Sequence, residues 1–277
     1  MTTDHVRTHH LVFTGKTTDI FSAEFLKSLG WAVTIIGFPV AILIWCRWWI
    51  RHIVLTDGTT FIFSGTLKQS FLLTLLAILA GLPQEIARAI GISGVVDRSL
   101  GPALLVALPA LVSLYLLGGF ILPALVQREF LKWWCDDTQP ITGAGITFVG
   151  RPWPFIGWNV AHVLSIFTII GWAWVFRAYA QWVCTNITSA GRSFRFTGSG
   201  AEILWRGSVT FAACCGIVTL PWALVWFARW FYRNITVEIP QDSANPTENV
   251  SIHMAASPTP VTDACSTFLS TGIPNKI

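Results

Sequence analysis

The sequence predicts a polytopic α-helical membrane protein built from four internal repeats. Each repeat runs from a strand through a broken apolar helix to a second strand, and short β-hairpins form a small sheet on the cytoplasmic side. Three observations predict this fold. The chain is 53% apolar and only 12% charged, whereas an ordinary soluble domain carries about twice that charged share. A Phe-x-Gly signature precedes each apolar stretch, and a basic, aromatic segment ends each one.

These two signatures divide the chain into four repeat units, and internal repetition of this kind indicates a repeated architecture. The strand signatures are Val12–Gly15, Phe61–Gly65, Ile146–Gly150 and Phe194–Gly198. The helix ends are Arg47–Ile53, Arg128–Trp134, Arg177–Val183 and Trp222–Thr236. The predicted integral membrane domain, residues 11–239, holds the units 12–56, 61–138, 146–187 and 194–237. We expect a flexible polar arm at residues 1–10 and a disordered tail at residues 240–277, which is rich in Ser, Thr, Pro and Asn.

Unit 1 begins with a short predicted strand, Leu11–Thr14, and continues into an apolar run, Leu29–Trp49. Gly37 and Pro39 interrupt that run, and a Pro inside a helix breaks or kinks it. The pair Asp57-Gly58 then lies between β-rich flanks, which is a strong hairpin signal. We therefore expect a broken helix followed by a tight β-hairpin.

Unit 2 is the longest repeat and holds two apolar segments, Lys68–Leu82 and Gly101–Gln127. The second easily exceeds the roughly 20 residues that a membrane span requires. We predict two crossings joined by a loop at residues 91–100. Thr138–Gly150 contains one Pro and several Gly, and we predict a second hairpin there.

Units 1, 3 and 4 are too short for two full spans. About 25–30 residues separate their strands, and two arms of roughly 12 residues each reach only about 18 Å. In units 3 and 4 the apolar runs are broken at Gly171, Gly216 and Pro221. Each of these three units is therefore either a re-entrant helical hairpin or a single kinked span, and the charge pattern favours the hairpin.

The basic residues predict the topology. Of the 18 Lys and Arg residues, only Arg88 and Arg98 lie in the 83–100 region, and positive charge marks the cytoplasmic side of short loops. We therefore expect a multi-pass protein with both termini and the hairpins in the cytoplasm. On that side Leu11–Thr14 and Asn234–Ile239 can join the hairpins in one sheet.

The arginines at the helix ends are the main candidate site, namely Arg47, Arg128, Arg177 and Arg229. One interpretation is interfacial anchoring beside an aromatic belt. The other is a ring of guanidinium groups that binds phosphates, lipid headgroups or other anions. The second interpretation places the four side chains around a pseudo-symmetric centre.

Acidic residues give two further candidate sites. Glu24 and Glu202 stand at unit starts, and Ser199 with Glu202 forms a Ser-x-x-Glu capping box, so capping or pairing with an arginine is expected. Glu85 and Arg88 lie near the end of an apolar segment and form a candidate outer ion site.

The sequence gives no sign of a cofactor, a metal or catalysis. The cysteines and histidines lack metal-ligand spacing, and no catalytic motif stands in a suitable context, so we expect no enzyme. The net charge of +4 does not indicate nucleic-acid binding, because the basic residues sit at the ends of apolar runs.

The signatures resemble the DUF898 family of uncharacterised bacterial inner-membrane proteins over about residues 12–238. Unit 4 carries the resemblance through Phe196, Gly198, Glu202, Pro221, Trp222, Arg229, Tyr232 and Asn234. Unit 1 carries it through Phe13, Gly15, Pro39, Arg47, Gly58, Phe61, Phe63 and Gly65. Units 2 and 3 depart from the pattern, because no Asn-Thr follows Arg128 and Gln181 stands where a basic residue is usual. The resemblance implies an inner-membrane location and a repeat architecture, and it transfers no catalytic residue.

Two functions remain open at this point. The first is a scaffold or anionic-lipid-interacting protein of the inner membrane, with membrane lipids as partners. It could also form a homo-oligomer or bind another membrane protein. The alternative is a small transporter or pore built from internal repeats with re-entrant helices. Few polar residues lie near the helix breaks, which disfavours transport of a polar solute.

Overall fold

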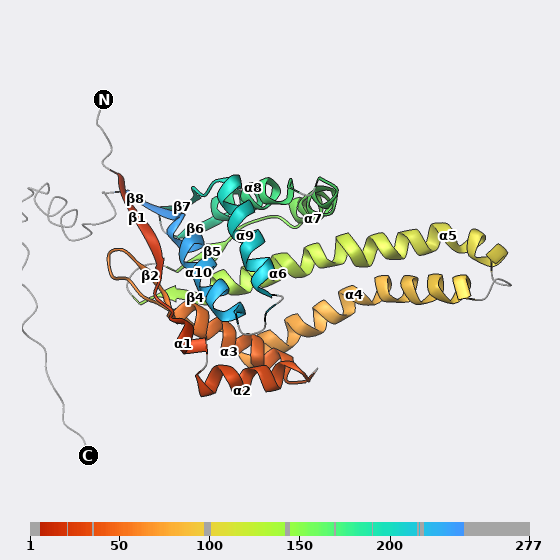
Figure 1. The fold of residues 1–277 in the computed structure, drawn as a ribbon, viewed down its shortest axis with the longest axis horizontal. Coiled ribbons are helices and arrows are strands. Elements are labelled where there is room, and N and C mark those ends of the chain that lie inside the picture. Colours follow the sequence, from red (N-terminus) through yellow and green to blue (C-terminus); the bar gives the residue numbers. More distant parts are fainter. Residues whose placement is uncertain are drawn as a thin grey trace, which may run out of the picture. The chain divides into compact units, whose positions relative to one another are not determined.

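The computed structural model describes residues 6–240 apart from residues 21, 35, 97–100, 142–144, 169, 190, 215 and 217–218. The predicted tail, residues 240–277, lies outside the described residues except for Pro240, which ends a strand, and the first five residues of the predicted arm also lie outside them. Residues 6–10 of that arm belong instead to the first strand. Strands gather at one end of this part of the chain, and helices extend from them (Figure 1).

The strands form one curled sheet and a separate two-stranded ribbon. The six-stranded sheet has the order β2-β1-β8-β7-β6-β5, and the ribbon pairs β3 with β4. Every pairing is antiparallel. The strand bounds are β1 Val6–Phe13, β2 Ile53–Leu55, β3 Phe61–Phe63, β4 Thr138–Pro140, β5 Thr147–Phe148, β6 Ile187–Ser189, β7 Arg192–Phe196 and β8 Ile235–Pro240. A single bridge between Val54 and Thr60 links β2 to β3, so the strands follow one another in chain order around the curl.

The predicted fold class, a polytopic α-helical membrane protein, was wrong. The chain is a mixed helix and sheet protein, and its six-stranded sheet curls into a half-barrel. Only two described helical segments are long and apolar enough to cross a membrane. The physical reason is that strands pair within the repeat units as well as between them. The sheet is therefore a main layer of the fold rather than a small addition.

Three units each place a pair of short helices between two strands. These pairs are α2 (Ala23–Ala32) with α3 (Phe38–Arg51), α7 (Trp153–Ile166) with α8 (Trp172–Thr185), and α9 (Gly200–Cys214) with α10 (Leu220–Arg233). A short helix α1 (Thr17–Ile20) precedes the first pair. The two strands that flank each helix pair are hydrogen-bonded directly to each other, namely β1 to β2, β5 to β6 and β7 to β8. Each helix pair therefore leaves the sheet and returns to it as a helical hairpin.

Unit 2 carries the two candidate spans, Leu67–Ile92 and Val106–Asp136. They lie in α4 (Leu67–Val96) and in a run formed by α5 (Gly101–Leu116), the π-helix η2 (Leu117–Ile121) and α6 (Leu122–Asp136). Only 22% and 6% of their most apolar windows are buried, so neither resembles the core helix of a soluble protein. The predicted loop at 91–100 is helical as far as residue 96, and its remaining residues lie outside the described part.

The predicted hairpin at Thr138–Gly150 was also wrong. Its first strand, β4, pairs with β3, and its second strand, β5, pairs with β6. The turn at Asp57-Gly58 does form, with Gly58 at φ +90°, a backbone conformation that favours glycine. Beyond the bridge at Thr60, however, the chain leaves β2 and pairs with β4.

The same aromatic pair recurs in all four units and holds strand to helix. The Phe of each Phe-x-Gly signature meets a Trp near the end of the last helix, with ring centroids 5.0–6.4 Å apart and planes at 61–85°. The pairs are Phe13–Trp48, Phe63–Trp133, Phe148–Trp182 and Phe196–Trp230. Edge-to-face packing is the favourable geometry for such rings. These pairs define a common register for the four units.

Candidate functional site

Three of the four predicted arginines hold neighbouring units together. Arg47 donates from Nη2 to the carbonyl oxygen of Gly65 at 3.1 Å, and Arg128 donates from Nε to that of Gly150 at 3.3 Å. Arg229 donates from Nη2 to Gly15 at 2.9 Å. Each acceptor is the glycine of a Phe-x-Gly signature in the next unit, and Arg229 joins the last unit to the first. We call these contacts the unit clamps.

Arg177 does not make a unit clamp. In its unit Gln181 makes a related contact: its Nε2 donates to the carbonyl oxygen of Phe196 at 3.4 Å, two residues before the signature glycine. The Nε of Arg177 is buried and has no hydrogen-bond partner among the described residues. Five positions before the C-cap of the last helix, the four units hold Arg47, Lys132, Gln181 and Arg229. Arg128 and Arg177 stand one turn earlier, so the four predicted arginines do not occupy one equivalent position.

The predicted capping box is present at the start of α9. Ser199 Oγ accepts from the Glu202 backbone N–H at 3.2 Å, and the Glu202 carboxylate accepts from the Ser199 hydroxyl at 3.2 Å. Sequence reasoning missed the equivalent box in unit 2. There Gln69 Oε1 accepts from the Thr66 backbone N–H at 2.7 Å.

Glu24 does not correspond to Glu202 in this register. Asp19 stands at the equivalent place, four positions after the signature glycine, and accepts from the backbone N–H of Lys16 at 2.8 Å. Glu24 belongs to the first turn of α2, and its side chain lies outside the described residues. The structure therefore makes Asp19 the capping residue of unit 1.

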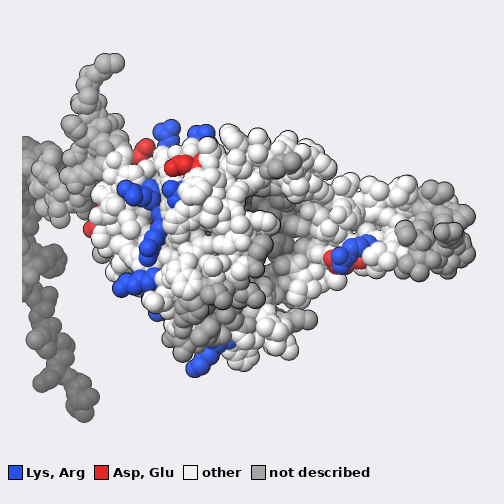
Figure 2. Space-filling view, viewed as in Figure 1, with Lys and Arg blue, Asp and Glu red and all other residues white. Residues whose placement is uncertain are grey.

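Glu85 and Arg88 form an ion pair on α4, within the first candidate span. Their side chains are 57% and 64% exposed. The surrounding arm is otherwise almost free of charge in the face shown (Figure 2). An i,i+3 pair of opposite charges lowers the cost of carrying ions on an apolar helix. In the described part of the chain no group of His, Cys, Asp or Glu could hold a metal ion.

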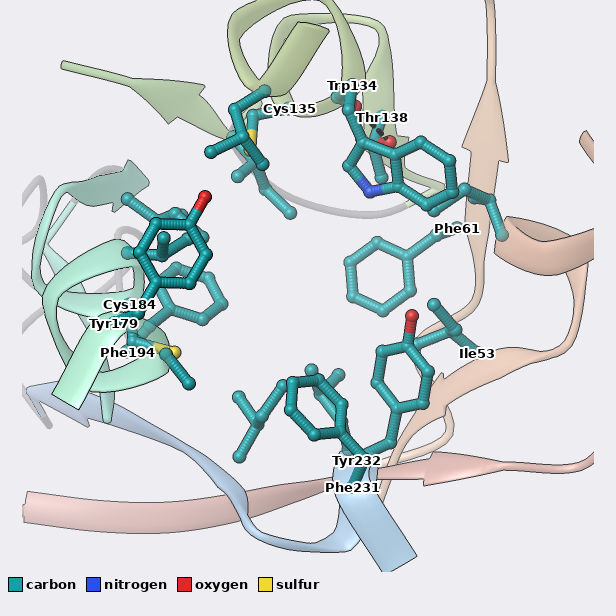
Figure 3. Close-up of a pocket in the computed structure, with 18 of the residues that line it drawn as sticks. Ile53, Phe61, Trp134, Cys135, Thr138, Tyr179, Cys184, Phe194, Phe231 and Tyr232 are labelled. Atoms are coloured by element: carbon teal, nitrogen blue, oxygen red, sulfur yellow. Dashed lines mark hydrogen bonds between the residues drawn. The ribbon is translucent and has the colours of Figure 1, made fainter. Parts of the chain in front are cut away.

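The curled sheet and the ends of the helices line a partly open cavity of about 300 Å³ (Figure 3). Seven strands each contribute one lining side chain, and Ile146 contributes another just before β5. The strand residues are Leu11, Ile53, Phe61, Thr138, Ile187, Phe194 and Ile235. The cavity therefore belongs to all four units at once. We call it the ring cavity.

The last helix of each unit completes the wall of the ring cavity. Two positions before the helix C-caps stand Ile50, Cys135, Cys184 and Tyr232, and all four line the cavity. Trp134 and Tyr179 add larger aromatic surfaces. The wall is thus largely apolar and aromatic, with a few hydroxyl and thiol groups.

The polar groups of the ring cavity are neutral. The Tyr232 hydroxyl accepts a hydrogen bond from Trp49 Nε1 at 2.6 Å, and Thr138 donates its own to the Trp134 carbonyl oxygen. The Tyr179 hydroxyl has no hydrogen-bond partner within the described ranges. Burial raises the pKa of the Cys184 thiol to about 12, so this thiol stays protonated at neutral pH. Among the described residues that line the cavity, none carries a charged side chain.

The sequence interpretation missed the ring cavity and also missed Arg206. The guanidinium carbon of Arg206 lies 4.9–5.6 Å from the ring centroids of Trp205, Trp226 and Trp230. Cation–π contacts of this kind stabilise a partly buried cation. Arg206 lies in an apolar run, and its position there was the signal that could have identified it.

Comparisons with known proteins give no relative from which a role could be transferred. No family model, no curated protein and no solved structure matches the chain.

Proposed function

We propose that the chain is an integral membrane protein that interacts with anionic lipid and acts as a scaffold in the inner membrane. The observation that carries this proposal is the separation of apolar and basic side chains. Large apolar side chains are exposed at the far ends of the helix pairs, including Val33 at 86%, Phe167 at 82% and Phe211 at 76%. Basic side chains gather at the sheet end (Figure 2). A membrane surface matches both parts of this pattern.

The turns between the short helices also support contact with lipid. The Gly37 backbone N–H donates to the Thr34 hydroxyl at 3.0 Å, and Gly171 donates to Thr168 in the same way at 3.0 Å. Backbone polar groups need internal partners where water is absent. Both turns therefore carry partners that suit an apolar surrounding.

The helix lengths suggest how the chain would sit in a bilayer. At 1.5 Å per residue, α4 with 30 residues is about 45 Å long. The helices α3, α8 and α10, with 14 residues each, are about 21 Å long. A hydrocarbon core is about 30 Å thick. We propose that unit 2 crosses the membrane while the other helix pairs enter it partway, with both termini and the sheet in the cytoplasm.

Several exposed basic residues outside the unit clamps can attract anionic headgroups. They are Lys16, Arg51, Lys68, Lys132, Arg151, Arg195 and Arg233. Each Lys or Arg close to an anionic surface contributes about 1 kcal/mol of attraction. This set replaces the four helix-end arginines as the proposed headgroup contact, because three of those arginines bind carbonyl oxygens.

The transport alternative has less support. Polar side chains near the helix breaks bond to their own helices. His162 Nδ1 lies 2.7 Å from the Trp158 carbonyl oxygen, and Ser165 donates to His162 at 2.7 Å. Thr210 donates to Arg206 at 2.9 Å. A polar pathway needs groups that face a solute, so we propose no transport function. The resemblance to the DUF898 family stays a prediction.

Native mass spectrometry of the chain in nanodiscs tests the lipid proposal. We expect retained phosphatidylglycerol to exceed phosphatidylcholine, and salt to weaken that preference. The triple variant Arg51→Gln, Arg195→Gln, Arg233→Gln should lose most of it, whereas Arg88→Gln on α4 is the matched control. A preference that is insensitive to salt and to the triple variant would contradict the proposal.

Topology reporters test the proposed arrangement in the membrane. Reporters at Gly58, Gly145 and Gly191 should share the cytoplasmic side, and one at Gly94 should lie opposite. Reporters at the three turns that alternate between sides would exclude a single cytoplasmic sheet.

A further inference from the structure

We propose that the ring cavity is a binding site for one medium-length, uncharged single-chain molecule that carries a hydroxyl or carbonyl group. The cavity volume of about 300 Å³ lies at the lower end of the roughly 300–1,000 Å³ range of small-molecule sites. That size suits one hydrocarbon chain rather than a whole two-chain lipid. The bound chain would lie among aliphatic and aromatic side chains from all four units.

The wall of the cavity selects for an apolar ligand. Its strand positions carry Leu, Ile or Phe in all but one case, the exception being Thr138. A cavity with apolar walls does not hold water well and takes up apolar molecules instead. An ionised ligand would lose its hydration without meeting an opposite charge, which is strongly unfavourable. The site therefore discriminates against a carboxylate and in favour of a neutral molecule.

Two phenol groups supply the polar contact. The Tyr232 oxygen accepts from Trp49 at 2.6 Å, which leaves its own hydrogen available to a ligand. The Tyr179 hydroxyl has no partner within the described part of the chain, and both rings border the cavity (Figure 3). A hydroxyl or carbonyl oxygen can accept a hydrogen bond from either phenol. These donors give the ligand a preferred orientation.

The repeat itself sets this site apart from ordinary packing. At the position occupied by Thr138, the other units carry Ile53, Ile187 and Ile235. At the position of Ala180 in α8, unit 2 carries the larger Leu131, whereas units 1 and 4 carry the small residues Cys46 and Ala228. Thr138 and Ala180 both border the cavity. The chain therefore lacks, at Thr138, the bulk that its other three units carry, and Leu131 shows that a larger side chain at the position of Ala180 is compatible with the fold.

This inference rests on the proposed function only for the source of the ligand, because a membrane supplies single-chain amphiphiles. Binding itself depends on the cavity and can be measured away from a bilayer. Loss of anionic-lipid preference would leave cavity binding intact, and loss of cavity binding would leave the lipid preference intact. The two proposals therefore fail separately.

Calorimetric titration of the full chain in amphipol with 1-decanol tests the proposal. We expect saturable binding of one molecule per chain, and at least tenfold weaker binding of decanoate at pH 8. Ala180→Leu should weaken 1-decanol binding at least tenfold, while Ala178→Leu, the same change two residues away on α8, should not. Tyr179→Phe should weaken binding severalfold without changing the melting temperature.

Two results would overturn the proposal. One is heat that rises in proportion to 1-decanol without saturation and is unchanged by Ala180→Leu. The other is equal affinity for 1-decanol and decanoate. Circular dichroism checks that each variant folds. If Ala180→Leu does not fold, Thr138→Ile serves the same purpose, because it installs the residue that the other three units carry.

Discussion

Replacement of Arg229 by leucine tests the unit clamp that joins the last repeat to the first. Arg229 donates to the Gly15 carbonyl oxygen at 2.9 Å across 214 residues of sequence. Leucine keeps much of the apolar stem but removes the donor. We therefore expect the variant to unfold more easily than the wild-type protein does.

The expected loss follows from the hydrogen bond. A hydrogen bond from a charged donor contributes about 1.5–3 kcal/mol, and Arg229 is solvent-exposed, so we expect the lower figure of about 1.5 kcal/mol. For a chain of this size each kcal/mol moves the melting temperature by about 2–4 °C. Arg229→Leu should therefore lower the melting temperature in detergent by about 3–6 °C.

Arg229→Gln provides the matched control, because the equivalent position in unit 3 is naturally Gln181 and that residue reaches the Phe196 carbonyl oxygen. We expect the glutamine variant to recover more than half of the loss. Circular dichroism melts of the three proteins measure this order. A leucine variant as stable as wild type, or a glutamine variant as unstable as the leucine variant, would refute the clamp and favour an anion-binding role for Arg229.

Three further predictions use the same melting assay. Gly198→Ala should cost about 1–3 kcal/mol by overpacking, because its Cβ would lie 2.6 Å from the Phe196 ring. Gly157→Ala, which meets no atom within 4 Å, should gain about 0.5–1 kcal/mol; equal effects would contradict the role of the signature glycine. Ser199→Ala should cost about 1 kcal/mol by removing the cap of α9, and no loss would mean that the capping box is dispensable. Burial alone would raise the pKa of Asp57, but hydrogen bonds from Thr59 and nearby positive charges lower it below 3.8. Its stabilising effect is then present above pH 3.8 and lost as the pH falls further, so Asp57→Asn should flatten the acid limb of a melting-temperature profile, and an unchanged limb would contradict this.

The short signatures predicted much of the local structure because the contacts behind them join residues that are close in sequence. The Phe-x-Gly signature occurs where a strand ends and the Phe ring occupies the space above the glycine. The Ser199-x-x-Glu202 pattern predicted a cap because both hydrogen bonds lie within one turn. The arginines suggested a wrong equivalence between the four units. Arg128 lies one helical turn before the position that Arg47 and Arg229 occupy, yet it reaches the equivalent glycine carbonyl group. Alignment on Trp133 and Trp182 would have given the register that the structure shows.

The fold class could not be derived in the same way. Strands such as Ile53–Leu55 and Phe61–Phe63 have three residues each, which is too short for a clear alternating pattern. Their partners are far away in sequence, since β3 pairs with β4 across a 30-residue helix and the segments that follow it. High apolar content then favoured a helical membrane protein in which the strands form only a small sheet. The ring cavity could not be predicted for the same reason, because it forms only when strands from all four units lie together in the folded chain.

The four units differ at one set of equivalent positions that face the cavity, and this difference separates structure from function. Phe, Gly and Trp recur at equivalent places because each unit needs the same ring-to-ring contact and the same close approach of strand to helix. Two positions before the helix ends, the units instead carry Ile50, Cys135, Cys184 and Tyr232. If these positions served packing alone, the same residue type could stand at all four of them. Departures from a local rule are expected at functional sites, so the variation among these four residues favours the ring cavity over the clamps as the place where the protein recognises a ligand.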